Sequence, residues 1–209
     1  MKIEPLIVGP LEVNCYIAIC EETNHAAIID PGDDEQKILD FIRKTGVKVT
    51  HILLTHGHSD HIAAVAPVQR ATQARILVHR DEAPLLDLAE ELSQMFGLRV
   101  PEPFKVDEYF QDGDVITTGN SEFKVISTPG HSPGSVCFLT GQDLLAGDTL
   151  FRNSIGRTDL PGGSYYDLIR SIKGKLFKLD GATRVLPGHG PSTTIEHEMR
   201  NNPFLADRS

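Results

Sequence analysis

The chain has 209 residues, of which 40% are hydrophobic and 23% charged, a balance typical of a soluble globular protein. Its net charge of −9 argues against a nucleic-acid partner, because that affinity depends on Lys and Arg contacts with phosphates. No apolar stretch is long enough to span a membrane, so no membrane partner is expected either. We expect a single domain over residues 1–209, with a core large enough to need no disulfides.

The three cysteines are predicted to be buried structural thiols. Cys15 and Cys20 lie in the apolar run 13–20, and neither they nor Cys137 form a C-x-x-C motif. The N-terminus shows no signal-peptide pattern. Free thiols fit a reducing compartment, so a cytoplasmic location is expected.

The first half of the chain reads as alternating strands and helices. Alternation predicts strands at about 2–8, 13–20 and 25–30, and then a helix opened by Asp33, Asp34 and Glu35 and closed by Gly46. A strand at 49–54 precedes a helix at about 61–72, a short strand at 75–78, and a helix from near Pro84 to about Phe96.

The second half begins with short strands between residues 105 and 147, separated by turn residues. Ser164 is expected to cap a helix, and Thr193 with Glu196 forms a predicted capping box for a last helix ending near Asn201. Strands followed by helices, twice over, indicate two β-sheets packed face to face with helices outside, an α+β fold.

The segment 55–61, Thr-His-Gly-His-Ser-Asp-His, is the strongest chemical signal. It places four candidate metal ligands, His56, His58, Asp60 and His61, directly after the apolar run 52–54. So many imidazoles and a carboxylate in one loop would be costly without a shared cation. Gly57 is expected to permit the tight turn that aims them.

Three later segments repeat this logic. His131, Asp148 and His189 each follow a short apolar run and lie beside glycine, as expected where strand ends converge on one point. Seven ligands exceed the needs of one tetrahedral ion. We assign His56, His58 and His131 to one metal ion, Asp60, His61 and His189 to a second, and Asp148 between them. The isolated His25, His51, His79 and His197 are not expected to bind metal.

The motifs THGHSDH, PGHSPGS, LLAGDTLF and LPGHG resemble those of metallo-β-lactamase fold hydrolases over nearly the whole chain. VNCY near the start, GDTLF and NNPFL resemble hydroxyacylglutathione hydrolases (glyoxalase II) in particular. The resemblance implies a four-layer αβ/βα sandwich and the same seven ligands. His61 stands where the commonest true β-lactamases have Arg, so a penicillin-type substrate is not expected.

Some positions depart from the glyoxalase II pattern. Gly190 and Pro191 follow the last ligand where that family commonly has Glu-Tyr, whose Tyr helps to hold glutathione. Arg157 matches a basic position of the family, but Asp159 replaces the aromatic residue after it. The sequence stops short of the fuller members, whose C-terminal helical domain completes the glutathione pocket, and so resembles the short, single-domain branch of the family.

The resulting hypothesis is a binuclear metal-dependent thioesterase acting on S-2-hydroxyacylglutathione-type small molecules such as S-lactoylglutathione. Two divalent ions, zinc first with iron or manganese also compatible, would make hydroxide available near neutral pH. Asp60 is assigned to orient this nucleophile as well as to bind metal. Arg157 is assigned to a substrate carboxylate; the alternative is that it pairs with Asp159 and only orders its loop.

Other functions stay open at this stage. Residues 156–159, Gly-Arg-Thr-Asp, resemble a loop of the persulfide dioxygenases, which would use one Fe(II) held by His56, His131 and Asp148. A lactonase and a non-catalytic metal-binding module are the further alternatives.

Overall fold

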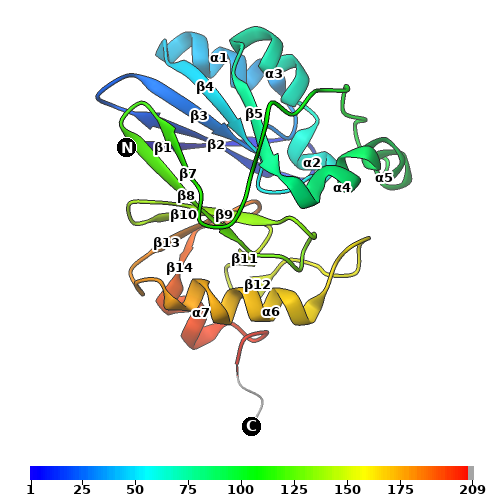
Figure 1. The fold of residues 1–209 in the computed structure, drawn as a ribbon, viewed down its shortest axis with the longest axis vertical. Coiled ribbons are helices and arrows are strands. Elements are labelled where there is room, and N and C mark those ends of the chain that lie inside the picture. Colours follow the sequence, from blue (N-terminus) through cyan, green and yellow to red (C-terminus); the bar gives the residue numbers. More distant parts are fainter. Residues whose placement is uncertain (207–209) are drawn as a thin grey trace.

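Two six-stranded sheets lie face to face in this protein, with helices on both outer sides (Figure 1). The structure is a computed structural model, and it describes residues 1–206. The predicted α+β class and the four-layer αβ/βα sandwich are therefore confirmed. None of the helices in these residues is long and apolar enough to cross a membrane.

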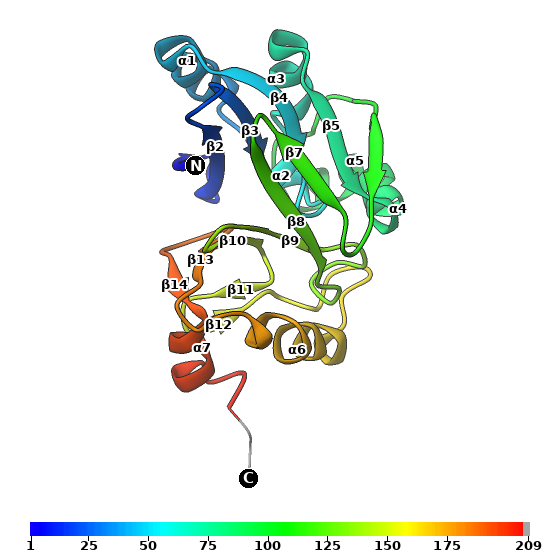
Figure 2. The same ribbon diagram turned by 60° about the vertical axis from the view of Figure 1, so that its left-hand side comes forward.

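The first sheet has the strand order β1-β2-β3-β4-β5-β6. Strands β1 to β3 pair antiparallel, and β3 to β6 pair parallel. Helices α1 and α3 cover its outer face (Figure 2). The elements of this half are β1 Lys2–Val8, β2 Val13–Cys20, β3 His25–Ile29, α1 Glu35–Thr45, β4 Lys48–Leu53, α2 Ser59–Ile62, α3 Val65–Thr72, β5 Arg75–His79, a 3-10 turn η1 Arg80–Glu82, α4 Ala83–Asp87, α5 Ala89–Phe96 and β6 Glu108–Phe110.

The second sheet has the order β14-β13-β10-β9-β8-β7, and only β10 and β13 pair parallel. Helices α6 and α7 cover its outer face (Figure 1). Its elements are β7 Val115–Thr118, β8 Ser121–Ser127, β9 Val136–Thr140, β10 Asp143–Gly147, the small hairpin β11 Leu150–Phe151 and β12 Ser154–Ile155, α6 Tyr165–Gly174, a 3-10 turn η2 Leu176–Lys178, β13 Arg184–Pro187, β14 Thr193–Thr194 and α7 Ile195–Asn201.

Residue alternation along the central strands builds this sandwich. In β2, Cys15 and Ile17 point to the helices of the first layer, whereas Tyr16 and Ala18 point between the sheets. Successive strand residues face opposite sides, so both faces of a central strand must be apolar when both are covered. All eight residues of β2 are buried, which explains why the run 13–20 is apolar.

The hydrophobic core between the two sheets is separate from the core between the second sheet and its helices. Phe123, Val125 and Phe138 pack between the sheets, while Cys137 and Leu144 face α6 and α7. The rings of Phe110 and Phe138 meet edge to face across the inter-sheet space, with centroids 5.5 Å apart. The three cysteines are buried and free, as predicted.

Two predicted helices are each divided in the structure. The helix expected at 61–72 is split into α2 and α3 because the Ala64 amide donates to the Pro31 carbonyl, 3.0 Å away, instead of continuing the helical ladder. The helix expected from Pro84 to Phe96 breaks at Leu88, whose amide bonds three residues back to Leu85. Both breaks arise from local backbone contacts that side-chain periodicity does not reveal.

Two of the predicted helix caps are present in the structure, and a third is shifted by one residue. Gly46 ends α1 in the left-handed conformation, and the Ser164 hydroxyl accepts from the Asp167 amide, 3.3 Å away, as expected. The capping box at Thr193 is wrong by one residue. Thr194 is the N-cap of α7 and accepts from the His197 amide, because Thr193 belongs to β14 and its hydroxyl donates to Glu198.

Truncating the inter-sheet core should be costly. Phe138→Ala is expected to lower the free energy of unfolding by about 3–5 kcal/mol, since its side chain is fully buried. Tyr166→Ala, at a side chain that is 74% exposed, should change it by less than about 0.5 kcal/mol. Urea unfolding of both variants at matched metal content tests this, and equal losses would contradict the assigned core.

Candidate metal centre

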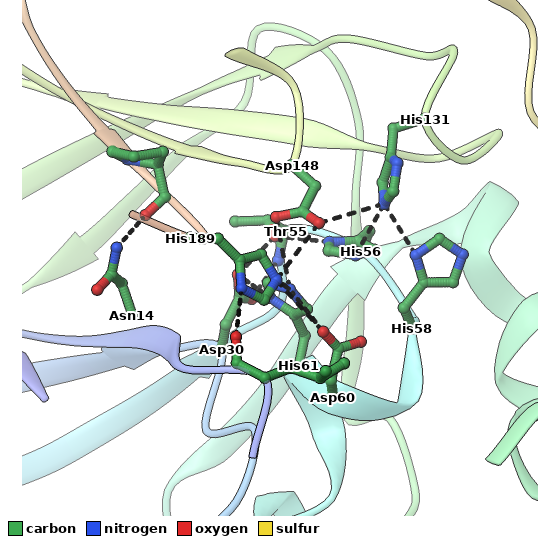
Figure 3. A network of polar contacts seen from close by, with 12 residues as sticks. Asn14, Asp30, Thr55, His56, His58, Asp60, His61, His131, Asp148 and His189 are labelled. Atoms are coloured by element: carbon green, nitrogen blue, oxygen red, sulfur yellow. Dashed lines mark hydrogen bonds and ion pairs between the residues drawn. The ribbon is translucent and has the colours of Figure 1, made fainter. Parts of the chain in front are cut away.

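The structure brings the seven predicted ligand side chains together where strands of both sheets end (Figure 3). His56 follows β4, and His58 is the N-cap of α2, which also carries Asp60 and His61. The other three side chains come from the second sheet: His131 follows β8, Asp148 follows β10 and His189 follows β13. The parallel strands β10 and β13 place their carboxyl ends, and with them two of these side chains, at one edge.

His56, His58 and His131 form one buried group whose ligand atoms lie within 4.8 Å of one another. His58 Nδ1 faces His131 Nε2 at 2.8 Å, and His131 Nε2 faces His56 Nε2 at 3.2 Å. Converging ring nitrogens are electron-rich unless protonated, so a shared cation suits this arrangement better than further protons would.

Asp60, His61 and His189 form the second group. His189 Nε2 lies 3.3 Å from both Asp60 Oδ2 and His61 Nε2. The His61 ring is fully buried, whereas the His189 side chain is 27% exposed. The second group is therefore the one more open to solvent.

Asp148 lies between the two groups (Figure 3). Its Oδ1 is 3.5 Å from His61 Nε2, and its Oδ2 is 3.7 Å from His131 Nε2 and 3.6 Å from His189 Nε2. Oδ1 is buried without a hydrogen-bond partner in the described part of the chain, which is costly for a carboxylate oxygen. A nitrogen and oxygen donor set with such an oxygen at its centre fits a pair of divalent ions.

Burial and nearby carboxylates shift the pKa values of the five histidine rings in opposite directions. Burial lowers the pKa of His56 and His131, and lowers that of His58 to about 3, so these rings are neutral and ready to bind metal. Burial works in the same direction at His61, but the carboxylates of Asp148 and Asp60 outweigh it and raise its pKa to about 10. The pKa of His189 is also raised, against burial, by its contact with Asp60.

Asp30, which no sequence motif indicated, lies at the end of the predicted strand 25–30 and contacts the ligand loop. Its Oδ1 accepts from the Thr55 amide at 2.8 Å, and its Oδ2 accepts from the Thr55 hydroxyl at 2.6 Å and from His61 Nδ1 at 3.1 Å. Asp30 also lies near His56 and His61 as a third group of ligand atoms, but both of its oxygens are engaged in these contacts. Asp30 therefore orients His61, whose Nε2 is left facing the centre.

Two other ligand rings are oriented by backbone carbonyls. His131 Nδ1 donates to the Arg157 carbonyl at 2.8 Å, and His189 Nδ1 donates to the Leu11 carbonyl at 2.9 Å. Such contacts fix the ring tautomer, so that Nε2 carries the lone pair that faces the cation.

Asn14 and Tyr16, from the VNCY segment, hold the loop that carries His189. The Asn14 side chain donates to the carbonyls of Pro187 and Gly190 at 3.0 and 2.8 Å, and the Tyr16 hydroxyl donates to Pro187 at 2.7 Å. The sequence resemblance included this segment but gave it no role. Gly188 in the same loop leaves no room for a side chain, since a Cβ there would collide with Asp148.

Glu82, which no sequence motif indicated, joins the two loops that carry the first histidine group. Its buried carboxylate accepts from the Gly57 amide at 2.7 Å, and from the Gly134 amide and the Ser132 hydroxyl at 2.6 Å each. A side chain at Gly57 would crowd this contact, since its Cβ would lie 3.1 Å from both Glu82 Oε2 and Leu86 Cδ2. The expectation that Gly57 serves a tight turn gives only part of its role, because its φ angle is not positive.

A pocket of about 560 Å³ opens over the centre, within the range of small-molecule sites. His58, Asp60, His131, Asp148 and His189 form its floor. Arg157 lines it as well, but its Nε and Nη2 donate to the two carboxylate oxygens of Asp159, at 2.8 Å each. The Arg157 guanidinium therefore forms an ion pair with Asp159 in this structure.

The remaining histidines lie outside these groups in residues 1–206. His51 Nδ1 contacts the hydroxyls of Thr50 and Thr118, His79 caps η1, and His197 Nε2 contacts Asn153. These three side chains have local structural partners, and none of the four remaining histidines, His25 included, belongs to a group of potential ligands.

The sequence matches the metallo-beta-lactamase superfamily over residues 8–189, and the chain belongs to that superfamily. It is 36% identical to the hydroxyacylglutathione hydrolase GloC of Haemophilus influenzae, with 100% of both chains covered. It is 39% identical to the probable metallo-hydrolase YqgX of Bacillus subtilis, with 98% of each covered. The chain is thus a metallo-hydrolase of this superfamily, and the family and its His/Asp clusters together support binding of divalent metal ions.

Two solved structures are similar over nearly their whole length. The BLEG-1 B3 metallo-beta-lactamase superposes with a TM-score of 0.92 at 37% identity, covering 98% of this chain and 99% of that one. TTHA1623, solved in a di-iron-bound form, superposes with a TM-score of 0.89 at 41% identity, covering 97% and 100%.

Removing the Glu82 carboxylate should weaken metal binding. Glu82→Ala leaves the buried amides of Gly57 and Gly134 without this acceptor and frees the two ligand loops, so we expect metal affinity to fall about 10–100-fold. Asp81→Ala, at the neighbouring exposed carboxylate, is the matched control. Competition with a chromophoric chelator measures both, and equal affinities would refute the role of Glu82.

Metal uptake should release protons. The pKa of His61, raised to about 10, means that this ring holds a proton at neutral pH, and the pKa of His189 is raised in the same direction. A metal ion requires the neutral ring, so its binding must displace a proton. Metal affinity should therefore rise as pH rises from near 6.5 toward 10. Calorimetric titration in buffers of different ionisation enthalpy measures the release; zero net protons would contradict the assigned charge state.

Proposed function

We propose that the chain hydrolyses thioesters of the S-2-hydroxyacylglutathione type, such as S-lactoylglutathione, using two divalent ions of which zinc is the first expectation. The proposed ligands are His56, His58 and His131 for one ion, Asp60, His61 and His189 for the other, and Asp148 for both. The proposed partner is thus a small molecule, with no nucleic acid and no membrane involved. The similarity to GloC supports the substrate type.

The observation that carries the proposal is the position of Asp148 between the two ligand groups, on the floor of the pocket. Divalent ions bound there would lower the pKa of a water molecule and polarise a carbonyl oxygen. Asp60, whose pKa is lowered by His61 and His189 against the effect of burial, stays ionised and can accept a hydrogen bond from the attacking water. The chain's own contribution is thus to orient the nucleophile.

The pocket wall favours a thioester over an amide. Apart from the proposed metal ligands, the polar residues that line it in the described chain are Ser59, Ser154 and Arg157. None is a good proton donor to a leaving amine. A thiolate leaves at a pKa near 8.5 and needs no such donor.

Arg157 is proposed as the contact for a substrate carboxylate at the pocket mouth. Its side chain is 54% exposed, and the Asp159 side chain that holds it is 69% exposed. Exposed ion pairs contribute little free energy, so an incoming carboxylate can exchange with Asp159.

A mononuclear Fe(II) persulfide dioxygenase is the second candidate. His131 Nε2 lies close to both His56 Nε2 and Asp148 Oδ2, at 3.2 and 3.7 Å, so these three side chains could hold one iron. This ligand set would leave four side chains of the centre without an assigned use: His58, Asp60, His61 and His189.

Metal quantification combined with an activity screen separates the candidates. We expect close to two metal ions per chain and hydrolysis of S-lactoylglutathione. One iron with oxygen uptake on glutathione persulfide would support the dioxygenase instead. A lactone and a β-lactam belong in the screen, the latter because of the similarity to BLEG-1. Bound metal without turnover of any of these would support a non-catalytic metal-binding module.

Asp148→Ala should abolish thioester hydrolysis and lower metal content, because it removes the carboxylate between the two groups. Asp40→Ala, at an exposed carboxylate on α1, is the control and should retain the parent rate and metal content. An unchanged rate in Asp148→Ala would rule out the bridging assignment.

A further inference from the structure

The pocket over the metal centre has a wall of apolar side chains above its polar floor. Leu11 comes from the β1–β2 turn, Leu92 and Phe96 come from α5, and Phe151 and Ile155 come from the β11–β12 hairpin. These three segments are far apart in the sequence, and each contributes apolar side chains to the pocket wall. A pocket of this kind binds ligands chiefly by excluding water from apolar groups.

The rim of this wall is exposed. Leu11 is 47% exposed and Phe96 is 46% exposed, although both are large apolar residues. Large apolar side chains that line a concave site and remain open to solvent favour a ligand that covers them.

The polar groups of the wall are largely engaged already. The Ser59 hydroxyl donates to the Ala89 carbonyl at 3.1 Å and accepts from Ser93 at 2.7 Å. Arg157 is held in a two-pronged contact by Asp159. The interior of the pocket therefore offers little to the carboxylates of glutathione. These are better placed at the solvent end, where Arg157 can exchange its exposed partner Asp159 for a substrate carboxylate.

We propose that this pocket binds the alkyl side chain of the acyl group, and that the chain prefers 2-hydroxyacyl thioesters with a longer alkyl side chain than lactoyl. The inference rests on the proposed thioesterase function. It assigns Leu11, Leu92, Phe96, Phe151 and Ile155 to acyl selection. The glutathione portion points outward, toward the pocket mouth and Arg157.

The first test varies only the acyl chain. S-2-hydroxyacylglutathiones from lactoyl to 2-hydroxyoctanoyl are assayed on the metal-loaded protein. Each methylene that becomes fully buried should raise kcat/KM about fourfold until the pocket is filled. A flat or falling series would overturn the inference and leave the thioesterase function standing, whereas no turnover of any member would refute that function.

The second test measures binding without turnover. S-methylglutathione and S-hexylglutathione are thioethers that cannot be hydrolysed, and calorimetry gives their Kd values. We expect the hexyl compound to bind at least about tenfold more tightly. Equal Kd values would overturn the inference whatever the catalytic activity.

Two variants of one helix complete the design. Phe96→Ala should reduce the hexyl-to-methyl affinity ratio about threefold or more, because it removes one wall of the pocket. Met95→Ala, at the adjacent residue on α5 that is 68% exposed and does not line the pocket, should leave the ratio unchanged. Equal effects of the two variants would contradict the assignment of the wall.

Discussion

The whole centre depends on backbone hydrogen bonds that join the loops at the strand ends. The Asn14 amide donates to the Gly188 carbonyl and the Gly188 amide donates to Gly147, both at 2.7 Å, while the Val136 amide donates to Thr55 at 2.9 Å. The first and the last of these contacts connect the two sheets, since Asn14 and Thr55 belong to the first sheet and its loops, and Gly188 and Val136 to the second. Neutral ring nitrogens that face one another compete for the same protons, and carboxylates in the same small space repel one another. The backbone bonds hold the loops of these side chains together against that repulsion.

The strand pattern and the ligand residues could be predicted from the sequence for a shared reason. A central strand that is covered on both faces must be apolar throughout, which is visible in the run 13–20. A histidine or aspartate that follows a short apolar run and lies next to glycine also stands out, as at His131 and Asp148. Both signals are local in the sequence, so no knowledge of which strands are neighbours is needed to find them.

The residues that were missed act through contacts between distant segments. Asp30 bonds to Thr55, Asn14 bonds to Gly190, and Glu82 bonds to Gly134. Several of these partners are backbone amides or carbonyls, which every residue possesses, so no residue type or spacing marks them. The divided helix at 61–72 has the same cause, since the carbonyl of Pro31 takes the amide of Ala64. A local sequence pattern therefore does not predict a hydrogen bond between a polar side chain or amide and a partner in a distant segment.

The same contacts explain how the pocket wall can vary while the centre stays intact. Leu11 and Arg157 each present a side chain to the pocket and a carbonyl to a ligand ring, of His189 and His131 respectively. Because the ring nitrogens bond to carbonyls, a substitution at either position changes the wall and keeps the acceptor that orients the ligand. In these two residues the backbone carbonyl orients a metal-ligand ring, and the side chain shapes the pocket proposed to select the acyl group. This separation lets one scaffold hold its metal geometry while the shape and polarity of the substrate pocket change around it.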